Sequence, residues 1–551
     1  MYQYDALDKR IQTDRVAQYR EQTQRFVDGT LSNTEFLPLR LQNGLYIQRL
    51  APMLRIAVPY GMINSTQLRR VARISRDYDK GYVHFTTRQN IQLNWPELPE
   101  SPDILAELNE VEMHANQTSG NCIRNTTTDQ FAGVAEDELT DPRPYCELIR
   151  QWSTFHPEFA FLPRKFKIAV CASRTDRAAV YFHDIGLEMA RNAQQEIGFK
   201  IIVGGGLGRT PVIGSVIQEF VSVDALLPYL EAILRVYNLH GRRDNKYKAR
   251  IKILVRALGI DTFRDMVDEE YNAHALTIDN IGKEVTRLSS FFTPPAYDNS
   301  LNADTLDTEL AALAASNEGF ARWLDKNTHP HKHAAYRCVT LSFKKAGIPP
   351  GDANDQQLEA AANLADKYSF SELRISHHQN LVLSDVSKKD LFKVWAAAQT
   401  HGFADANIGT LNDMICCPGG DYCALANAKS IPIAEAIQRM FNDYEQLDQI
   451  GHLELNISGC MNACGHHHIG HIGILGVDKK GEEFYQVSLG GNQTQDAKLA
   501  KILGPSFSAN DVPNVIKTLI DVYLASRQAG ERFVDTYARI GIEPFKETVY
   551  A

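Results

Sequence analysis

The sequence predicts an α+β protein built from two similar halves. Residues 85–93, FTTRQNIQL, match residues 375–383, ISHHQNLVL, at an offset of 290 residues. The match extends without a gap over 36 residues and includes a turn, a helical pattern and a strand pattern. Chance similarity between amphipathic segments is the weaker interpretation, because all three features agree in register. We therefore expect two related copies of one structural unit.

Each copy reads as a strand, a Pro-Gly turn, a helix, a second strand and a further helix. The turns lie at 58–61 and 348–351, and the last helices are expected over 102–114 and 387–400. Residues 81–93 and 371–383 alternate apolar and polar side chains, as half-buried strands do. This order of elements resembles a ferredoxin-like α+β unit.

Weaker sequence similarity continues after each copy. Residues 129–132 echo 421–424, residues 183–187 echo 470–474, and residues 203–206 echo 488–491. Each half should therefore add a larger mixed α/β unit to its ferredoxin-like unit. The expected segments are a surface-wrapping N-terminal stretch (1–35), two units of the first half (36–116 and 117–293), a connector (294–333) and two units of the second half (334–405 and 406–551).

Composition excludes several classes of protein. The 551 residues are 44% hydrophobic and 23% charged, as in ordinary globular proteins. The net charge of −9 does not favour nucleic acid as a partner, because non-specific binding to phosphates needs clustered cations. No stretch approaches the roughly 20 apolar residues that span a bilayer, so we expect no membrane partner. The polar N-terminal residues show no secretory pattern, and cytoplasmic location is the expectation.

Cysteines cluster in one part of the chain. Five of the nine lie between residues 416 and 464, and an odd total argues against a disulfide framework. Cys417 and Cys423 are separated by five residues, and Cys460 and Cys464 by three. Four thiolates suit zinc or an iron–sulfur cluster. The five-residue gap and its Gly-Gly pair favour the larger iron–sulfur group, with zinc and buried free cysteines as the alternatives.

The stretches CPGGDYC and ISGCMNACG resemble the sirohaem and [4Fe–4S] signature of the nitrite/sulfite reductase family, most of all its assimilatory sulfite reductases. The resemblance implies that Cys417, Cys423, Cys460 and Cys464 hold the cluster and that Cys464 also bridges it to the sirohaem iron. Cys416 lies one residue too early for the family spacing. His471 stands where the family usually has an acidic residue, a departure near the cluster that leaves all four ligands present.

The resemblance also implies a cationic active site, because sirohaem and its substrates are anions. The residues that match the family's anion-binding positions are Arg55, Arg124, Lys165 and Lys167. Lys165 and Lys167 are two apart, which places both side chains on one face of a strand. The stretch Thr86, Thr87, Arg88 and Gln89 resembles one that contacts the macrocycle, and Asn462 is a further candidate contact. In the second half His377 and His378 replace Thr87 and Arg88, so only the first half keeps the cation.

Lys167 favours sulfite over nitrite as the main substrate. Family members that reduce nitrite typically carry Asn there, within PRKWN, whereas this chain has PRKFK. The resemblance then implies six-electron reduction of sulfite to sulfide in assimilatory sulfur metabolism, with nitrite reduction to ammonia as the alternative. A non-catalytic iron–sulfur or zinc scaffold is an alternative of another class, but it has no need of the four cations.

Electrons should come from a separate partner, either a flavoprotein subunit that uses NADPH or a ferredoxin, because no flavin or NADPH region is evident. The stretch 204–209 is rich in glycine but lacks the dinucleotide-binding spacing. Residues 242–256 are rich in cations, which suits a solvated face or a docking surface. The run 466–468 consists of three histidines beside Cys464, for which packing or support of the cluster is the favoured interpretation.

Overall fold

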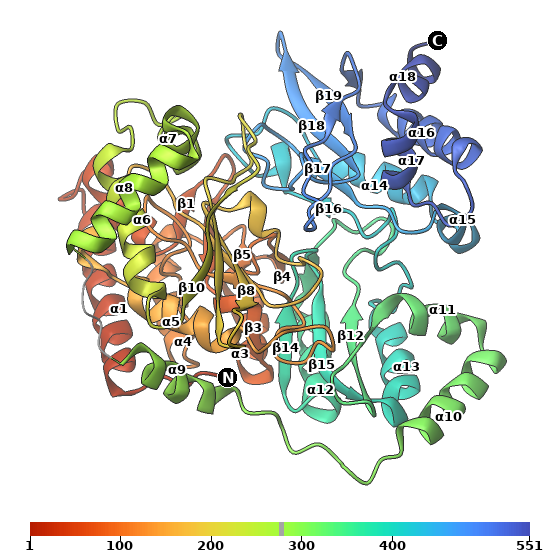
Figure 1. Cartoon of the computed structure of the whole chain (residues 1–551), viewed down its shortest axis with the longest axis horizontal. Helices are drawn as coiled ribbons and strands as arrows, with labels where there is room; N and C mark the ends of the chain where they lie inside the picture. Colours follow the sequence, from red (N-terminus) through yellow and green to blue (C-terminus); the bar gives the residue numbers. More distant parts are fainter. Residues whose placement is uncertain (275–279) are drawn as a thin grey trace.

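The computed structural model describes residues 1–274 and 280–551; residues 275–279 of the predicted 117–293 unit lie outside this description. Figure 1 shows the two halves side by side, with the first half in red to green and the second in green to blue. A long green segment crosses the bottom of the view and joins them. The predicted α+β class with two ferredoxin-like units is confirmed.

Each half contains one small antiparallel sheet. The first has the order β1 (Leu45–Ile47), β2 (Pro52–Ile56), β5 (Ile91–Leu93), β4 (Tyr82–Phe85), β13 (Asp352–Asn354). The second has the order β11 (Thr328–Pro330), β12 (Tyr336–Leu341), β15 (Leu381–Ser387), β14 (Glu372–Ile375), β3 (Met62–Asn64). The edge strands β3 and β13 are exchanged, because each pairs with the sheet of the other half. The two halves are therefore joined by backbone hydrogen bonds as well as by side chains.

The helices that follow the exchanged strands repeat in detail. Helix α3 (Ser65–Tyr78) and helix α12 (Asp355–Tyr368) both have 14 residues and begin 290 residues apart. Each starts with a capping box, in which an Asn side chain and a Gln side chain satisfy each other's backbone N–H groups. The two helices pack against each other, and Arg69 of α3 lies 2.6 Å from the carboxylate of Asp366 of α12.

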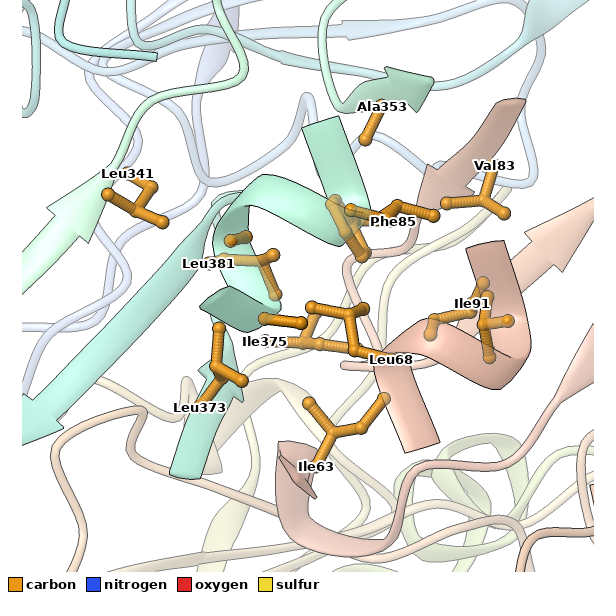
Figure 2. Packing of buried hydrophobic residues seen from close by; sticks show 14 of the residues in the cluster. Ile63, Leu68, Val83, Phe85, Ile91, Leu341, Ala353, Leu373, Ile375 and Leu381 are labelled. Carbon is orange, nitrogen blue, oxygen red and sulfur yellow. The ribbon is translucent and has the colours of Figure 1, made fainter. Parts of the chain in front are cut away.

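The two ferredoxin-like units share one hydrophobic core. Figure 2 shows side chains from Ile63 to Ile91 of the first half and from Leu341 to Leu381 of the second half meeting in the same interior. Phe85 and Ile375, which end equivalent strands, are both fully buried there. Since apolar burial is the main favourable term in folding, neither unit has a complete core by itself.

The two larger units also carry equivalent sheets. The first has the order β10 (Ser215–Ser222), β9 (Ile197–Val203), β8 (Ile185–Arg191), β7 (Ile168–Cys171), β6 (Thr127–Thr128). The second has the order β16 (Ile415–Cys416), β17 (Leu455–Ser458), β18 (Ile472–Lys479), β19 (Glu482–Leu489), β20 (Lys501–Ile502), and β21 (Phe507–Ser508) also pairs with β19. In both sheets the last two strands at one edge pair in parallel, β6 with β7 and β16 with β17.

Helices cover these sheets and form the ends of the chain. They are α1 (Ala6–Val27), α2 (Asn33–Gln42), α4 (Ser101–Asn109), α5 (Arg143–Ser153), α6 (Leu226–His240), α7 (Ile251–Leu258), α8 (Ile260–His274), α9 (Ile281–Ser289), α13 (Leu391–His401), α14 (Ile431–Met440), α15 (Tyr444–Ile450), α16 (Val512–Ser526), α17 (Phe533–Ile540) and α18 (Glu543–Tyr550). Within the described residues, no helix combines the length and apolar character needed to cross a membrane.

The predicted connector folds into helices α10 (Ala303–Ser316) and α11 (Glu318–Asn327), and Trp323 of α11 is fully buried in the shared core. The predicted N-terminal stretch forms α1 and the start of α2, and Tyr19 of α1 is fully buried in that core. The helix predicted over 102–114 ends at Asn109, and the one predicted over 387–400 begins at Leu391. The boundaries between units stay a prediction.

Candidate active site

The four cysteines of the two motifs lie on two loops that follow the parallel strands β16 and β17. Cys417 comes directly after β16, and Cys460 follows β17. Backbone hydrogen bonds join the loops, from the N–H of Asn427 (2.8 Å) and of Ala428 (3.1 Å) to the carbonyl of Gly459. The order of the strands in the sheet therefore brings the two cysteine pairs to one place.

Glycines allow the loops to approach this closely. A Cβ atom on Gly419, whose φ is +57°, would lie 2.0 Å from the hydroxyl oxygen of Ser430. A Cβ atom on Gly465 would lie 1.9 Å from the carbonyl oxygen of Ile457. Any larger residue at these positions would collide with its neighbours, so the glycines of the motifs fix the shape of the loops.

The thiols act on one another. The thiol of Cys464 raises the pKa values of Cys417, Cys423 and Cys460, although burial contributes more to each shift. The pKa is about 12 for Cys417 and about 11 for Cys460. The backbone N–H of Gly459 donates to Sγ of Cys417 at 3.2 Å. The four cysteines therefore lie near enough to influence one another, and burial keeps the thiols of Cys417, Cys423 and Cys460 protonated until a cation displaces the protons.

A cluster fits this arrangement better than a single ion does. Among the residues that the structure describes, no three cysteine, histidine or carboxylate side chains converge closely enough to hold one metal ion. One zinc ion needs its ligands at about 2.0–2.3 Å from a single point, whereas a cluster takes each thiolate at a different iron. Cys416, the last residue of β16, is buried in the hydrophobic core, which supports Cys417 as the ligand.

Arg55 and Arg124, two of the predicted cations, form hydrogen bonds through their terminal Nη nitrogens and not through Nε. Arg55, on β2, donates from Nη2 to the side chain of Gln92 at 3.0 Å, and its guanidinium lies 5.6 Å from the centre of the Tyr46 ring. Arg124 donates from Nη1 to the carbonyl of Thr118 (2.7 Å) and from Nη2 to that of Gly120 (2.8 Å). The Nε atoms of both arginines are buried and have no hydrogen-bond partner among the described residues. Each guanidinium therefore keeps at least its Nε–H group for an anion.

Lys165 and Lys167 lie on either side of Phe166, which is fully buried in the core of the first half. The backbone of Phe166 accepts from Arg124 N–H at 2.7 Å and donates to Cys122 at 3.0 Å, so this segment is extended. Because side chains alternate along extended chain, both lysines leave the face opposite Phe166. The extended backbone therefore places the side chains of Lys165 and Lys167 on one face, as the spacing predicts.

Burial and neighbouring cations lower the pKa of both lysines. Burial is the larger cause for Lys165, whose pKa falls to about 8, and Arg124 adds to the shift. The thiol of Cys464 acts in the opposite direction on the same ammonium. For Lys167 burial comes first and the charge of Lys165 second, and its pKa lies well below the ordinary value. Asp184 acts in the opposite direction on Lys167, but Lys165, Arg88 and Arg250 outnumber it, and an excess of buried cations indicates a site for an anion.

A buried ion pair supports Lys167. The carboxylate of Asp184 is fully buried and accepts the backbone N–H of Lys167 at 2.8 Å. Arg250 donates to both oxygens of the same carboxylate, from Nε and from Nη2, each at 2.8 Å. This role of Arg250 could not be seen in the sequence, where it is one of several cations in the basic stretch 242–256. Asp184 could be found only through its match to His471 in the repeat.

The turn from Thr86 to Gln89 links the two halves. The hydroxyl of Thr87 donates to the carbonyl of Cys464 at 2.9 Å. The Thr86 hydroxyl accepts from the backbone N–H groups of Arg88 and Asn90. Gln89 donates to the carbonyl of Thr128, so its amide is engaged within the protein. Contact of these side chains with the macrocycle stays a prediction.

Two further predicted positions differ in their surroundings. Arg88 donates from Nη1 to the Thr127 hydroxyl (3.0 Å) and from Nη2 to the Asn125 carbonyl (2.6 Å), and burial lowers its pKa to about 9. Asn462 is exposed within the cysteine loop beside Cys460. Both stay candidate contacts of the macrocycle, Arg88 as part of the first half and Asn462 as part of the second.

The second half has no equivalent anion site. The backbone N–H of Ile185 donates to Lys167, and that of Ile472 donates to Glu454 in the same way. Lys167 N–H donates to the Asp184 carboxylate, and Glu454 N–H lies 3.1 Å from Nδ1 of His471. Glu454 therefore takes the place of Lys167, and by the same register His452 takes the place of Lys165. His471 therefore accepts the backbone N–H of Glu454 as Asp184 accepts that of Lys167, in a half where Glu454 and His452 stand in the places of the two lysines.

The glycine-rich stretch 204–209 is not arranged to hold a phosphate. The ammonium of Lys252 donates to the carbonyls of Leu207 (2.6 Å) and Thr210 (2.5 Å). The loop thus directs carbonyl oxygens at a cation, whereas a phosphate loop directs N–H groups at an anion. It also contacts the cysteine region, because the carbonyl of Gly208 lies 2.9 Å from Nε2 of His468. The adjacent ring of His467 is buried and has no hydrogen-bond partner among the described residues.

Family models match most of the chain. The nitrite and sulphite reductase 4Fe-4S domain matches residues 119–275 and 409–551. The nitrite/sulfite reductase ferredoxin-like half domain matches residues 48–111 and 341–401. Both models therefore match twice, as the internal repeat requires.

Individual relatives carry both substrate names. An assimilatory ferredoxin-dependent nitrite reductase of Haloferax mediterranei is 27% identical over 501 residues, which cover 87% of this chain and 80% of the relative. A sulfite reductase [ferredoxin] of Mycobacterium tuberculosis is 25% identical over 500 residues, which cover 88% of this chain and 82% of the relative. The structure of the NirA protein of Mycobacterium tuberculosis shares the fold, with a TM-score of 0.77 and 23% identity over 94% of this chain and 92% of that one.

Proposed function

This chain belongs to the nitrite and sulphite reductase family, and we propose that it is a sulfite reductase that uses a ferredoxin as its electron donor. Members of the family carry a sirohaem and a [4Fe–4S] cluster. Cys417, Cys423, Cys460 and Cys464 are the residues that would hold the cluster. When bound, the two groups supply single electrons and an iron centre for the anion.

The observation that carries the choice of sulfite is the second lysine. Sulfite has more negative charge than nitrite at neutral pH and must lose three oxygens as water. Lys167 adds a second amine beside Lys165, on the same face of the extended segment; burial and Lys165 lower its pKa, and an anion bound there would favour its charged form. A second cation stabilises the more highly charged anion and offers a further proton. The balance of charge therefore supports sulfite as the main substrate, with nitrite as a side reaction.

The arginines and lysines have different tasks in this proposal. Arg55 and Arg124 each have an Nε–H with no hydrogen-bond partner among the described residues, while the protein binds Nη2 of Arg55 and both terminal nitrogens of Arg124. Such fixed donors bind an anion without reorganising. Lys165 has a pKa of about 8, so its ammonium is charged at pH 7 but releases a proton readily. Lys165 and Lys167 are the residues that would protonate the oxygens as they leave.

The choice of electron donor rests on the names of the relatives. Relatives are named ferredoxin-dependent nitrite reductase and sulfite reductase [ferredoxin]. These names support a ferredoxin over a flavoprotein subunit as the partner that delivers electrons.

The test is to measure kcat/KM for sulfite and for nitrite with reduced ferredoxin as the only donor, and to assay sulfide and ammonia as products. We expect sulfite to have the higher kcat/KM and sulfide to account for the electrons consumed. A higher kcat/KM for nitrite would overturn the choice of substrate. Turnover with a flavoprotein and NADPH but none with ferredoxin would overturn the choice of donor.

A further inference from the structure

Gln89 and Gln379 hold the same place in the two halves. Each is buried and lies at the end of a tight turn with a positive φ, 57° for Gln89 and 61° for Gln379. A glycine makes room for each side chain: a Cβ on Gly61 would lie 2.7 Å from Nε2 of Gln89, and one on Gly351 would lie 2.8 Å from Cβ of Gln379. These glycines are themselves 290 residues apart. The repeat has thus kept both the glutamine and the space around it.

Gln89 binds backbone on both sides of the interface between the halves. Its Nε2 donates to the carbonyl of Thr128 (2.9 Å) and to that of Ile375 (3.1 Å). Its Oε1 accepts the N–H of Thr128 at 3.1 Å. The amide therefore forms two hydrogen bonds with the backbone of Thr128 in its own half. It forms a third with the carbonyl of Ile375, the last residue of β14 in the other half.

Gln379 makes the equivalent set of contacts. Its Nε2 lies 3.0 Å from each of the carbonyls of Cys416 and Phe85, and 3.0 Å from Nε2 of His84. Its Oε1 accepts the N–H of Cys416 at 3.0 Å. Phe85 and Ile375, the two acceptors in the opposite halves, are again 290 residues apart.

The strands that the glutamines hold are edge strands. Strand β6 ends one large sheet and β16 ends the other, and each has only two residues. An edge strand has unpaired N–H and C=O groups on its outer side. The amide of each glutamine donates to one such group and accepts from the other, so it replaces the missing neighbouring strand. Thr128 and Cys416 are buried, so water does not take this role.

The backbone segments that the two glutamines bind lie next to different parts of the candidate active site. Cys416 immediately precedes Cys417, whereas Thr128 lies on the strand that follows Arg124. We propose that Gln379 is a positioning residue for the cluster: its amide fixes the backbone of Cys416 and thereby the place of the Cys417 sulfur. Gln89 is the counterpart that fixes the anion-binding side. The inference deepens the proposed function through the cluster and does not depend on which anion is reduced.

The test compares Gln379→Met with Gln89→Met in the holoenzyme. Methionine has a similar length but cannot form the amide pair, so both variants lose equivalent hydrogen bonds in equivalent places. We expect Gln379→Met to lose iron to an excess of chelator about tenfold faster than the parent, the scale of effect seen when the support of a metal ligand is removed. We expect the midpoint potential of the cluster, measured by an EPR-monitored redox titration, to shift in the same variant.

Gln89→Met should change the rate of iron loss and the cluster potential less than Gln379→Met does, because Gln89 is joined to the cysteine loops only through the turn that contains Thr87. Its sulfite affinity, measured from the visible spectrum, should fall instead. Equal effects of the two variants on iron loss and potential, or none in Gln379→Met, would overturn the inference. If Gln379→Met does not fold, Gln379→Glu keeps the acceptor for Cys416 N–H and should show faster iron loss in the same direction; parent behaviour in that variant would overturn the inference. Nitrite preference in the parent would overturn only the proposed substrate.

Discussion

The hydroxyl of Thr87 donates a 2.9 Å hydrogen bond to the carbonyl of Cys464, which lies 377 residues further along the chain. Thr87 belongs to the predicted macrocycle-contacting turn of the first half, and Cys464 is the predicted bridging ligand in the second. The bond ties the anion side of the site to the cluster side. The candidate active site therefore includes residues from both halves that are in direct contact.

Thr87→Val should loosen this link. The change keeps the shape of the side chain and removes one hydrogen bond, which contributes about 0.5–1.5 kcal/mol. We expect the free energy of unfolding to fall by about that amount, with Thr87→Ser unchanged as the control. Denaturant unfolding of both variants is the measurement. Equal stability of the valine variant and the parent would mean that the bond contributes nothing.

Cys423→Ser should lose the cluster. Serine is a poor ligand for iron, and three thiolates leave one iron of the cluster without its protein ligand. We expect iron and acid-labile sulfide to fall to a small fraction of the parent content. Cys338→Ala is the control, because Cys338 is buried in a separate hydrophobic cluster and should retain full iron. Full iron content in Cys423→Ser would contradict the ligand assignment.

The affinity for sulfite should depend on pH through Lys165. Burial lowers the pKa of this lysine to about 8, so its charge is lost as the pH rises through that value. Sulfite binding favours the charged form, and kcat/KM should therefore fall between pH 7 and pH 9. About nine-tenths of the ammonium is charged one pH unit below the pKa and about one-tenth one unit above. Lys165→Arg should move the fall to higher pH; the same profile in both proteins would assign it to another group.

Arg250→Ala should destabilise the fold strongly. The change leaves the buried carboxylate of Asp184 without its partner, and breaking a buried pair costs about 3–5 kcal/mol. The double variant Arg250→Ala/Asp184→Asn removes the charge as well and should recover part of the loss. Chemical denaturation of the single and double variants measures the difference. A single variant as stable as the parent would show that Asp184 does not need Arg250.

Much of the fold could be predicted from the sequence, because the repeat shows which residues of the two halves are equivalent. The helices α3 and α12 begin at positions 290 residues apart, as the sequence match requires. The exchange of β3 and β13 could not be predicted, because the sequence does not specify which half a three-residue strand joins. In the site, the spacing of Lys165 and Lys167 predicted their common face. The Arg250 contact with Asp184 joins residues 66 apart and has no local pattern.

Lys167→Asn tests the central claim, that a second lysine makes this family member a sulfite reductase. The change removes an amine that a bound anion would hold in its charged, proton-donating form, and it leaves Arg55, Arg124 and Lys165 in place. The decisive measurement is kcat/KM for sulfite and for nitrite in parent and variant, with one electron donor and with sirohaem content matched. The account predicts that the sulfite-to-nitrite ratio falls by about tenfold or more, which corresponds to roughly 1.4 kcal/mol of differential stabilisation. An unchanged ratio would contradict it.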